Sequence, residues 1–290
     1  MSTEADIIES IDWSELWKEA LLAASWRKWE KDPVKFFDKK AKWYNQTVVR
    51  QTDNAQKISA KFNIDYGCSV LDIGSGPGTL AIPLAKIAGK ITAVDPSREM
   101  LHYLKENAEK KGIKNITCVN KKWEDVEIGK DIENHDIVIS SYSLAMTDIK
   151  KALSIMDQAA NRTICIFTSA GKTQWDYHVE IWPKLFKEAF VPGPDYIFVV
   201  NILYQLGIMA NVAIWEKNSR KKISDIDEAV KERVEYFNSS LPDAETIIRE
   251  CLEKKFTRDK EGLWAERKSK TAMIWWEKTT EEQGNARRNG

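Results

Sequence analysis

The sequence lacks an excess of either charge, since 44 lysine and arginine residues balance 44 aspartate and glutamate residues in a chain of 290 residues. A balanced chain gives no general reason to expect nucleic acid or an anionic membrane as partner. Long hydrophobic runs are also missing, because no apolar stretch approaches the roughly 18 residues of a membrane-spanning helix. The opening "MSTEADIIES" is polar and acidic, so no secretory signal is visible, and we expect a cytoplasmic protein.

Cysteine and histidine are scarce, with four cysteines and three histidines in the whole chain. The cysteines lie far apart, and no C-x-x-C pair occurs among them. We therefore expect buried thiols in a reducing compartment and no disulfide framework. A zinc site is not expected either, so no metal-binding residue is predicted.

Tryptophan, in contrast, is abundant, with 12 residues in the chain. Five of them precede residue 50, namely Trp13, Trp17, Trp26, Trp29 and Trp43. Large aromatic side chains dominate the burial of a core, which favours helix faces packed on a core. The alternative is an aromatic lid over a ligand.

Apolar residues at helical spacing predict helices over residues 6–30 and about 34–62. After Gly67, short apolar runs alternate with amphipathic segments, a pattern that predicts a parallel sheet with helices on both faces. The runs predict five strands, at 70–73, 91–95, 116–119, 136–140 and 163–168. The segments between them predict three helices, at 79–88, 97–110 and 149–160.

The regular alternation ends after Gly171. The later segments predict helices at 175–190 and 196–207, a strand at 210–215, charged helices within 223–255 and a strand at 271–276. We therefore expect three parts: an N-terminal helical cap at 1–62, one domain at 63–278 and a flexible tail at 279–290. The charged helical insertion at 220–260 is either a solvated face or a surface for a partner.

The stretch "VLDIGSGPGTLAIPLAK" at 70–86 places three glycines, Gly74, Gly76 and Gly78, between a buried strand and a helix. Glycines there let a ligand approach the backbone, and the start of the helix supplies free N–H groups. Dinucleotide-binding loops read G-x-G-x-x-G, whereas this loop is one residue shorter and follows Asp72. A carboxylate at that place repels a pyrophosphate but suits an ammonium group.

A second acid, Asp95, ends the second predicted strand. An acid at that position can bridge the two hydroxyl groups of a ribose. A ribose together with an amino acid describes S-adenosylmethionine as the ligand.

With these residues in place, "VLDIGSGPGTLAIPLAK" and the following "ITAVDPSREML" resemble the first two motifs of class I S-adenosylmethionine-dependent methyltransferases. The resemblance is good over about residues 36–170 and weaker beyond. It implies a Rossmann-like α/β fold, with a doubly wound and mainly parallel sheet of seven strands whose last strand inserts antiparallel. The N-terminal helical cap and a helical insertion before the last strand would be additions to that fold.

The resemblance also implies which residues hold the cofactor, S-adenosyl-L-methionine, which leaves as S-adenosyl-L-homocysteine. The residues at the methionine end would be Asp72, Gly74, Ser75, Gly76 and Gly78. Asp95 would hold the ribose, while Pro96 and Ser97 would border the adenine.

The segment "FDKKAKWYN" at 37–45 looks like the short N-terminal motif F-D-x-x-A-x-x-Y-D of many small-molecule members. The resemblance implies that Tyr44 closes over the cofactor. Asn45 stands where an aspartate is usual.

One stretch departs from the family pattern. After the third strand the family often reads G-D-A-E-D-L, whose first aspartate contacts the adenine amino group, but this chain reads "NKKWEDV" at 120–126. Lys122 occupies the aspartate position. Trp123 follows, and it either packs on the adenine edge or lies packed under the loop.

The segment "IVISSYSLAM" at 137–146 corresponds to the fourth strand and the loop beside the transferring methyl group. Ser140, Ser141 and Tyr142 would face the methionine part of the cofactor or the acceptor. Many relatives carry a histidine in this loop, and none is present here. Tyr142 and His178 are the candidate catalytic residues. His178 would be a base or, alternatively, a solvated residue on a helix.

Methyl transfer from a sulfonium is an in-line displacement, and a base is needed only when the acceptor is protonated. The fold therefore predicts the donor better than the acceptor. The aromatic region at 171–209 predicts an acceptor pocket or, alternatively, part of the core. We expect a small or medium-sized organic acceptor. Methylation of a protein or RNA site, a non-catalytic sensor of the cofactor, and the oligomeric state are left open.

Overall fold

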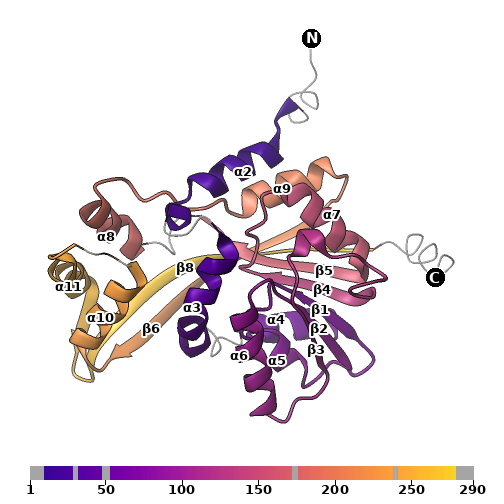
Figure 1. The fold of residues 1–290 in the computed structure, drawn as a ribbon, viewed down its shortest axis with the longest axis horizontal. Helices are drawn as coiled ribbons and strands as arrows, with labels where there is room; N and C mark the ends of the chain where they lie inside the picture. The colour runs from indigo at the N-terminus through magenta and orange to yellow at the C-terminus, as the bar shows by residue number, and fades with distance from the viewer. Residues whose placement is uncertain are drawn as a thin grey trace.

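The computed structural model describes residues 10–28, 32–47, 53–171, 176–237, 239 and 241–278. These residues form an α/β fold around one sheet of eight strands, in the order β3-β2-β1-β4-β5-β8-β6 with β7 paired to β8 (Figure 1). The predicted tail at 279–290 and Trp29 lie outside the described residues.

Five strands alternate with helices in the first part of the sheet, and three more follow. The strands are β1 (Ser69–Ile73), β2 (Lys90–Val94), β3 (Ile116–Val119), β4 (His135–Ser141), β5 (Ala160–Ser169), β6 (Asn211–Ile223), β7 (Phe256–Asp259) and β8 (Gly262–Glu277).

The helices include three before the first strand and two in the insertion before the last strands. The α-helices are α2 (Trp13–Ala23), α3 (Pro33–Thr47), α4 (Asp53–Phe62), α5 (Ala81–Leu84), α6 (Arg98–Glu109), α7 (Ile149–Ala159), α8 (Asp176–Phe186), α9 (Tyr196–Gln205), α10 (Ile226–Phe237) and α11 (Ala244–Lys255). Two short 3₁₀ helices are η1 (Ser25–Lys28) and η2 (Trp123–Asp125).

The topology confirms the fold class predicted from the sequence. Strands β1 to β5 occupy the five predicted apolar runs, and all their mutual pairings are parallel. Strand β8 lies between β5 and β6 and runs antiparallel to both. The insertion before the last strand is helical, as predicted, and consists of α10 and α11.

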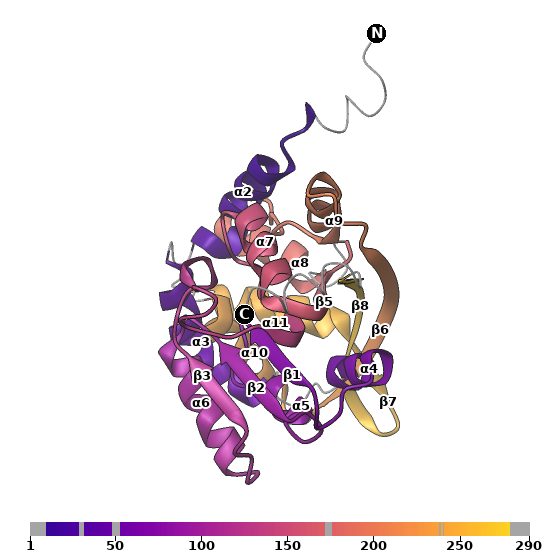
Figure 2. The ribbon, with the colours of Figure 1, turned by 90° about the vertical axis from the view of Figure 1, so that its right-hand side faces the viewer.

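Two apolar clusters cover the two faces of the sheet. Because successive residues of a strand point to opposite faces, Leu71 and Ile73 belong to one cluster and Val70 to the other. Helices α2, α7 and α9 contribute to the first cluster, and α4, α5 and α6 to the second. Figure 2 shows these two groups of helices in the upper and lower halves of the view. The sheet and the helices on its two faces therefore form a three-layer sandwich.

The N-terminal helices occupy three different places. Helix α2 packs against α7 and α9, α3 packs against α6, and α4 packs against β5 and α5. Trp17 of α2 is buried, and its indole N–H donates to the carbonyl oxygen of Met146 at 2.8 Å. For Trp17 the core interpretation of the N-terminal tryptophans is correct. The division of the chain at residue 62 stays a prediction.

The first helix after the glycine loop is shorter than predicted. The predicted helix at 79–88 is reduced to α5, from Ala81 to Leu84, and turns continue the segment to Ala88. Pro83 has no backbone N–H, so it cannot donate the helical hydrogen bond to the carbonyl oxygen of Thr79 that a helix over 79–88 would contain. The apolar residues of the segment are nevertheless buried, as the spacing indicated.

The last strands are much longer than predicted. The sheet has eight strands, whereas the sequence predicted seven. Strands at 210–215 and 271–276 were expected, whereas β6 extends to Ile223 and β8 begins at Gly262, with β7 as an additional strand. The extended parts form a two-stranded ribbon that leaves the sheet. Most residues of this ribbon are exposed, so no alternation of apolar and polar residues marks it in the sequence.

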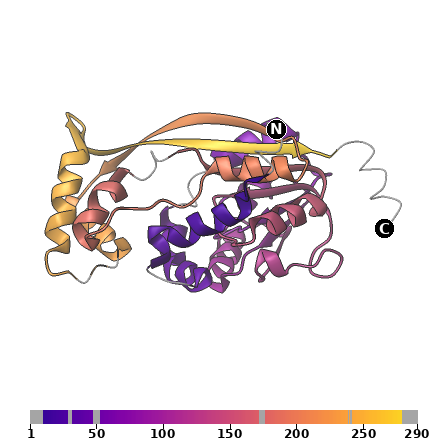
Figure 3. The same cartoon turned by 90° about the horizontal axis from the view of Figure 1, so that it is seen from above.

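Helices α8, α10 and α11, called the distal helices here, gather at the far end of this ribbon (Figure 3). They share a separate apolar cluster, whose largest members include Trp182, Phe237 and Ile248. The aromatic region after residue 171 is therefore divided. Trp182 belongs to the cluster of the distal helices, whereas Tyr196 and Phe198 pack on the cluster around α2 and α9.

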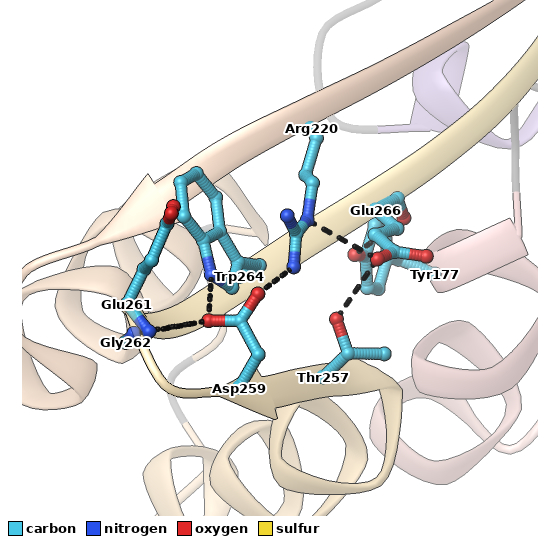
Figure 4. A network of polar contacts seen from close by, with 8 residues as sticks. All are labelled: Tyr177, Arg220, Thr257, Asp259, Glu261, Gly262, Trp264 and Glu266. Atoms are coloured by element: carbon cyan, nitrogen blue, oxygen red, sulfur yellow. Dashed lines mark hydrogen bonds and ion pairs between the residues drawn. The ribbon is translucent and has the colours of Figure 1, made fainter.

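A polar network fixes the far end of the ribbon (Figure 4). Asp259 accepts the backbone N–H of Glu261 and the indole N–H of Trp264, at 2.8 and 2.9 Å, and forms an ion pair with Arg220. The guanidinium of Arg220 lies 4.1 Å from the centre of the Trp264 ring. Cation–π contacts and hydrogen bonds thus stabilise a ribbon that has little apolar burial.

In the part of the chain that the structure describes, no helix is both long and apolar enough to cross a membrane. The four cysteines are free thiols, three of them buried.

Candidate functional site

The glycine loop follows β1 directly, and all three of its glycines adopt positive φ angles of 67°, 52° and 93° at Gly74, Gly76 and Gly78. This backbone conformation is difficult for residues with a Cβ atom. At Gly74 a Cβ atom would also lie 2.2 Å from the Cβ of Ser143. The sequence therefore needs glycine here both for the turn and for the close approach of the loop after β4.

Asp95 ties the end of β2 to this loop. Its two carboxylate oxygens accept the backbone N–H groups of Gly76 and Ser97, each at 2.8 Å. Burial raises the pKa of Asp95 to about 6, although both hydrogen bonds act in the opposite direction. The carboxylate is thus held in one orientation, and each oxygen keeps a lone pair for a further donor such as a ribose hydroxyl.

Ser97 begins α6, as the sequence predicted, because its Oγ accepts the backbone N–H of Met100 at 3.1 Å. The same hydroxyl donates to the carboxylate of Asp38 from α3 at 2.5 Å. Asp38 is the aspartate of the "FDKKAKWYN" segment, and sequence reasoning did not name it as a site residue. The F-D pair in that motif was the signal that pointed to it.

Two buried oxygen atoms beside the loop have no hydrogen-bond partner among the described residues. They are Oδ2 of Asp72 and Oγ of Ser75. Burial raises the pKa of Asp72 to about 7, and the Asp95 carboxylate acts in the same direction, against a hydrogen bond from the backbone of Ala81. Buried polar atoms are normally paired, so these two fit a ligand that supplies N–H or O–H donors.

Helix α3 is bound to the glycine loop through two asparagines. The amide of Asn107 on α6 donates to Oδ1 of Asn45 at 2.7 Å and to the carbonyl oxygen of Pro77 at 3.1 Å. An asparagine at position 45 therefore accepts a hydrogen bond as the usual aspartate would. Its neighbour Tyr44 packs against Trp43 and Phe37, and burial raises its pKa. That Tyr44 covers the cofactor stays a prediction.

The end of β4 meets the loop from the other side. Oγ of Ser143 donates to the carbonyl oxygen of Ile73 at 2.7 Å and lies 2.7 Å from Oγ of buried Ser140. Ser141 accepts a hydrogen bond from Asn54 of α4 at 3.4 Å. The predicted residue Ser140 is thus brought to the loop, and Ser143 is a neighbour that sequence reasoning missed.

The stretch after β3 separates into two parts. Lys122 is exposed at the start of η2. Trp123 is only 2% exposed and donates its indole N–H to the carbonyl oxygen of Ala152 at 3.0 Å. This contact favours the second interpretation of Trp123, which is packing in the core under α7. The predicted roles of Lys122 and Pro96 at the adenine stay predictions.

Tyr142 follows β4 in the left-handed conformation, with a φ of 54°, which is uncommon for a residue other than glycine. Its hydroxyl lies 2.6 Å from Oγ1 of Thr271 on β8, and half of its surface is exposed. A strained residue at the end of a parallel strand is typical of functional sites. The geometry therefore keeps Tyr142 as a candidate, in the role of an acceptor contact.

His178 lies on α8, one of the distal helices. The alternative interpretation, a solvated residue on a helix, is wrong, because the side chain is packed among aromatic rings. Its Nε2 is 3.2 Å from the hydroxyl of Tyr236, and the ring also packs against Phe190 and Phe237. Burial lowers the pKa of His178 to about 3, which makes its imidazole neutral at neutral pH and a weak base. We regard it as part of the aromatic packing of the distal helices.

No group of three or more His, Cys, Asp or Glu side chains is arranged to hold a metal ion in the ranges that the structure describes. The site instead offers a backbone cradle, two acids with raised pKa values and two oxygens that need donors.

Residues 64–190 match a family model described as a methyltransferase domain. An uncharacterized protein of Haemophilus influenzae is 28% identical over 269 residues, which are 93% of this chain and 97% of the relative.

Two solved structures share the fold at low identity. The YcgJ protein from Bacillus subtilis has a TM-score of 0.54 at 14% identity, over 79% of this chain and 99% of that one. A putative methyltransferase from Bacillus halodurans has a TM-score of 0.52 at 14% identity, over the same shares.

Proposed function

We propose that this chain transfers a methyl group from S-adenosylmethionine to a small or medium-sized organic acceptor, because residues 64–190 match a family model described as a methyltransferase domain. The observation that carries the proposal is the glycine loop, where buried Asp72 and Ser75 each keep an oxygen without a partner among the described residues. The α-ammonium group of the methionine part carries three N–H donors, which suit these oxygens.

The residues divide the binding of the cofactor between them. Asp72, Ser75 and the backbone of Gly74 and Gly76 would hold the amino acid part, and Asp95 would hold the ribose hydroxyls. When bound, the cofactor supplies a methyl group on a positively charged sulfur. The protein's contribution is to hold the acceptor atom in line with the carbon–sulfur bond.

The chemical balance is simple. The acceptor atom forms a bond to the methyl carbon as the carbon–sulfur bond breaks, S-adenosyl-L-homocysteine leaves as a neutral sulfide, and any proton of the acceptor passes to solvent. Because the cofactor is already activated, catalysis needs position more than a base. This agrees with a neutral His178 that packs among aromatic side chains.

A small acceptor is supported by the overall charge and by the additions to the fold. The chain has no excess of basic residues to bind RNA. The ribbon begins where β8 leaves β5 at Thr271, the residue that contacts Tyr142, and it leads to the distal helices. Such additions to a methyltransferase sheet are suited to enclosing a molecule of limited size.

The first experiment is a calorimetric titration of the full chain with S-adenosyl-L-homocysteine and, separately, with NAD. We expect binding of S-adenosyl-L-homocysteine in the micromolar range and none of NAD. An affinity for NAD above that for S-adenosyl-L-homocysteine would contradict the proposed cofactor site.

The second experiment transfers a radiolabelled methyl group to the components of a cell extract separated into small molecules, protein and RNA. We expect the label in the small-molecule fraction. Label confined to protein or to RNA would support methyltransferase activity but would contradict a small-molecule acceptor. Cofactor binding without any labelled product would favour a sensor of S-adenosylmethionine.

A further inference from the structure

Helix α3 lies between α6, beside the proposed cofactor site, and α10 of the distal helices (Figure 1). Among the described residues, α3 contributes no side chain to any of the three apolar clusters. Its buried Phe36 packs instead on Trp26 of η1, with the ring centres 5.5 Å apart. A helix that is held by polar and local aromatic contacts can dock and undock without opening the core of the protein.

Asp38 binds α3 to the N-terminal end of α6. Its Oδ1 accepts the hydroxyl of Ser97 at 2.5 Å and the backbone N–H of Glu99 at 3.5 Å. A carboxylate is favourable there, because the first N–H groups of a helix lack helical partners and carry partial positive charge. The backbone N–H of Ser97 donates to Asp95 at 2.8 Å, so a single residue separates α3 from the proposed ribose acid.

Lys40 binds α3 to the C-terminal end of α10. Its ammonium group donates to the carbonyl oxygens of Glu235 and Tyr236 at 3.2 and 3.1 Å, and it lies 5.2 Å from the centre of the Tyr236 ring. Helix α10 ends at Phe237, so both carbonyl groups belong to its last turn, where a cation is favourable. Because Asp38 and Lys40 are two positions apart on a helix, they point to nearly opposite sides of α3.

Helix α3 thus joins two helix ends through side chains of opposite charge, each matched to the partial charge of the end that it contacts. We propose that α3 couples cofactor binding to the distal helices: a cofactor bound to Asp95 favours docking of α3 on α6, and docked α3 holds the C-terminal end of α10. The proposal rests on the proposed cofactor site. It brings the helices that are suited to enclosing the acceptor into place only when the cofactor is bound.

The experiment measures hydrogen exchange of the backbone amides of the full chain by mass spectrometry, with and without a saturating amount of S-adenosyl-L-homocysteine. We expect the ligand to slow exchange in α3 and also, by about fivefold or more, in α10. The readout is the difference between the two conditions. A change that only loosens α10 raises both exchange rates and keeps this difference.

Lys40→Met tests the contact with α10 and leaves Asp38 in place. In this variant we expect the ligand to protect α3 as in the wild type, while the protection of α10 is lost. Lys42→Met is the matched control, because it removes a positive charge from an exposed position of the same helix. It should keep both protections.

Asp38→Ala tests the contact with α6. The variant should lose the protection of α10 and most of the protection of α3. It should also release S-adenosyl-L-homocysteine about ten- to hundredfold faster than the wild type, as the loss of a charge-assisted hydrogen bond implies. Should Asp38→Ala not fold, Lys40→Met still decides the question, because its contacts lie on the α10 side of the helix.

The inference is wrong if S-adenosyl-L-homocysteine leaves exchange in α10 of the wild type unchanged, if Lys40→Met keeps the protection, or if Lys42→Met loses it as well. Release of the ligand from folded Asp38→Ala at the wild-type rate would also contradict it. In each of these cases the wild type still binds the ligand, so the proposed function is unaffected. A wild type that does not bind the ligand would instead contradict the proposed function itself.

Discussion

Gly74 and Ser143 lie so close together that a Cβ atom on Gly74 would come within 2.2 Å of the Ser143 Cβ and 2.7 Å of its Oγ. Ser143 cannot withdraw freely, because its hydroxyl donates to the carbonyl oxygen of Ile73 at 2.7 Å. The glycine loop and the loop after β4 are therefore fitted to one another at the point where β1 ends.

This fit predicts the effect of Gly74→Ala, with Gly112→Ala as matched control. Both glycines have a φ of 67°, but nothing lies within 4 Å of a Cβ at Gly112. Both variants should lose about 1–2 kcal/mol of unfolding free energy from the left-handed conformation. Only Gly74→Ala should also weaken S-adenosyl-L-homocysteine binding, by tenfold or more, in calorimetry. Equal affinities for the two variants would show that the contact with Ser143 does not shape the cradle.

Asp95→Ala tests the support of the loop from β2. The change removes the acceptor of the Gly76 and Ser97 N–H groups as well as the proposed ribose contact. We expect a loss of about 1–3 kcal/mol in binding of S-adenosyl-L-homocysteine. Asp65→Ala is the control, because Asp65 also accepts a backbone N–H, that of Gly67 at 2.9 Å, but precedes β1 at the opposite end of the strand. A loss of the same size in the control would refute the assignment.

The raised pKa of Asp72 predicts the pH dependence of cofactor binding. An ammonium group favours the ionised carboxylate, which forms only as the pH rises toward about 7. Affinity for S-adenosyl-L-homocysteine should therefore increase between pH 5 and 7, by up to about tenfold per pH unit. Asp72→Asn should bind more weakly at pH 7 and should flatten this dependence. A wild-type affinity that is constant over this range would exclude Asp72 as the ammonium partner.

The same acids predict how the free protein responds to pH. Burial raises the pKa values of Asp72 and Asp95 from 3.8 to about 7 and about 6, so the folded chain binds these protons more tightly than the unfolded chain. The resulting stability is fully present below about pH 4 and is lost as the pH rises through 6 to 7. Urea unfolding of the wild type and of Asp72→Asn at pH 5 and at pH 8 measures this contribution to the free energy of unfolding.

The variant should lose less stability over that interval than the wild type, by as much as about 3 kcal/mol, since the folded-state pKa of about 7 lies two units above pH 5 and each pKa unit corresponds to about 1.4 kcal/mol. Identical pH dependence in the two proteins would mean that the pKa of Asp72 is not raised by burial.

The parallel part of the sheet could be predicted because both of its faces are covered. Each strand from β1 to β5 is a short apolar run, and the cofactor loop carries its own signal in Asp72, the glycines and Asp95. Packing of α3 was less visible, because Asp38 contacts Ser97 across 59 positions of the chain. Only the motif around Tyr44 indicated that this segment belongs to the site.

The ribbon could not be predicted, because neither of its faces is buried. Residues 216–223 are mainly charged or polar, and their strand conformation depends on pairing with β8 and on contacts such as Arg220 over Trp264.

Tyr142 and Thr271 provide a test of the junction between the loop after β4 and the ribbon. Their hydroxyl oxygens are 2.6 Å apart, and the hydrogen bond fixes a tyrosine whose φ is 54°. Tyr142→Phe and Thr271→Val should each lower the free energy of unfolding in urea by about 0.5–1.5 kcal/mol, as for one neutral hydrogen bond. The double variant should lose clearly less than the sum.

Binding of S-adenosyl-L-homocysteine should be unchanged in all three proteins, because neither hydroxyl belongs to the glycine loop. Methyl transfer to the labelled small-molecule acceptor should fall in each variant through a higher KM, since the loop loses the contact that positions the Tyr142 ring. Additive losses of stability would show that the two hydroxyls do not interact. A fall in cofactor affinity would indicate that Tyr142 contacts the cofactor and not the acceptor.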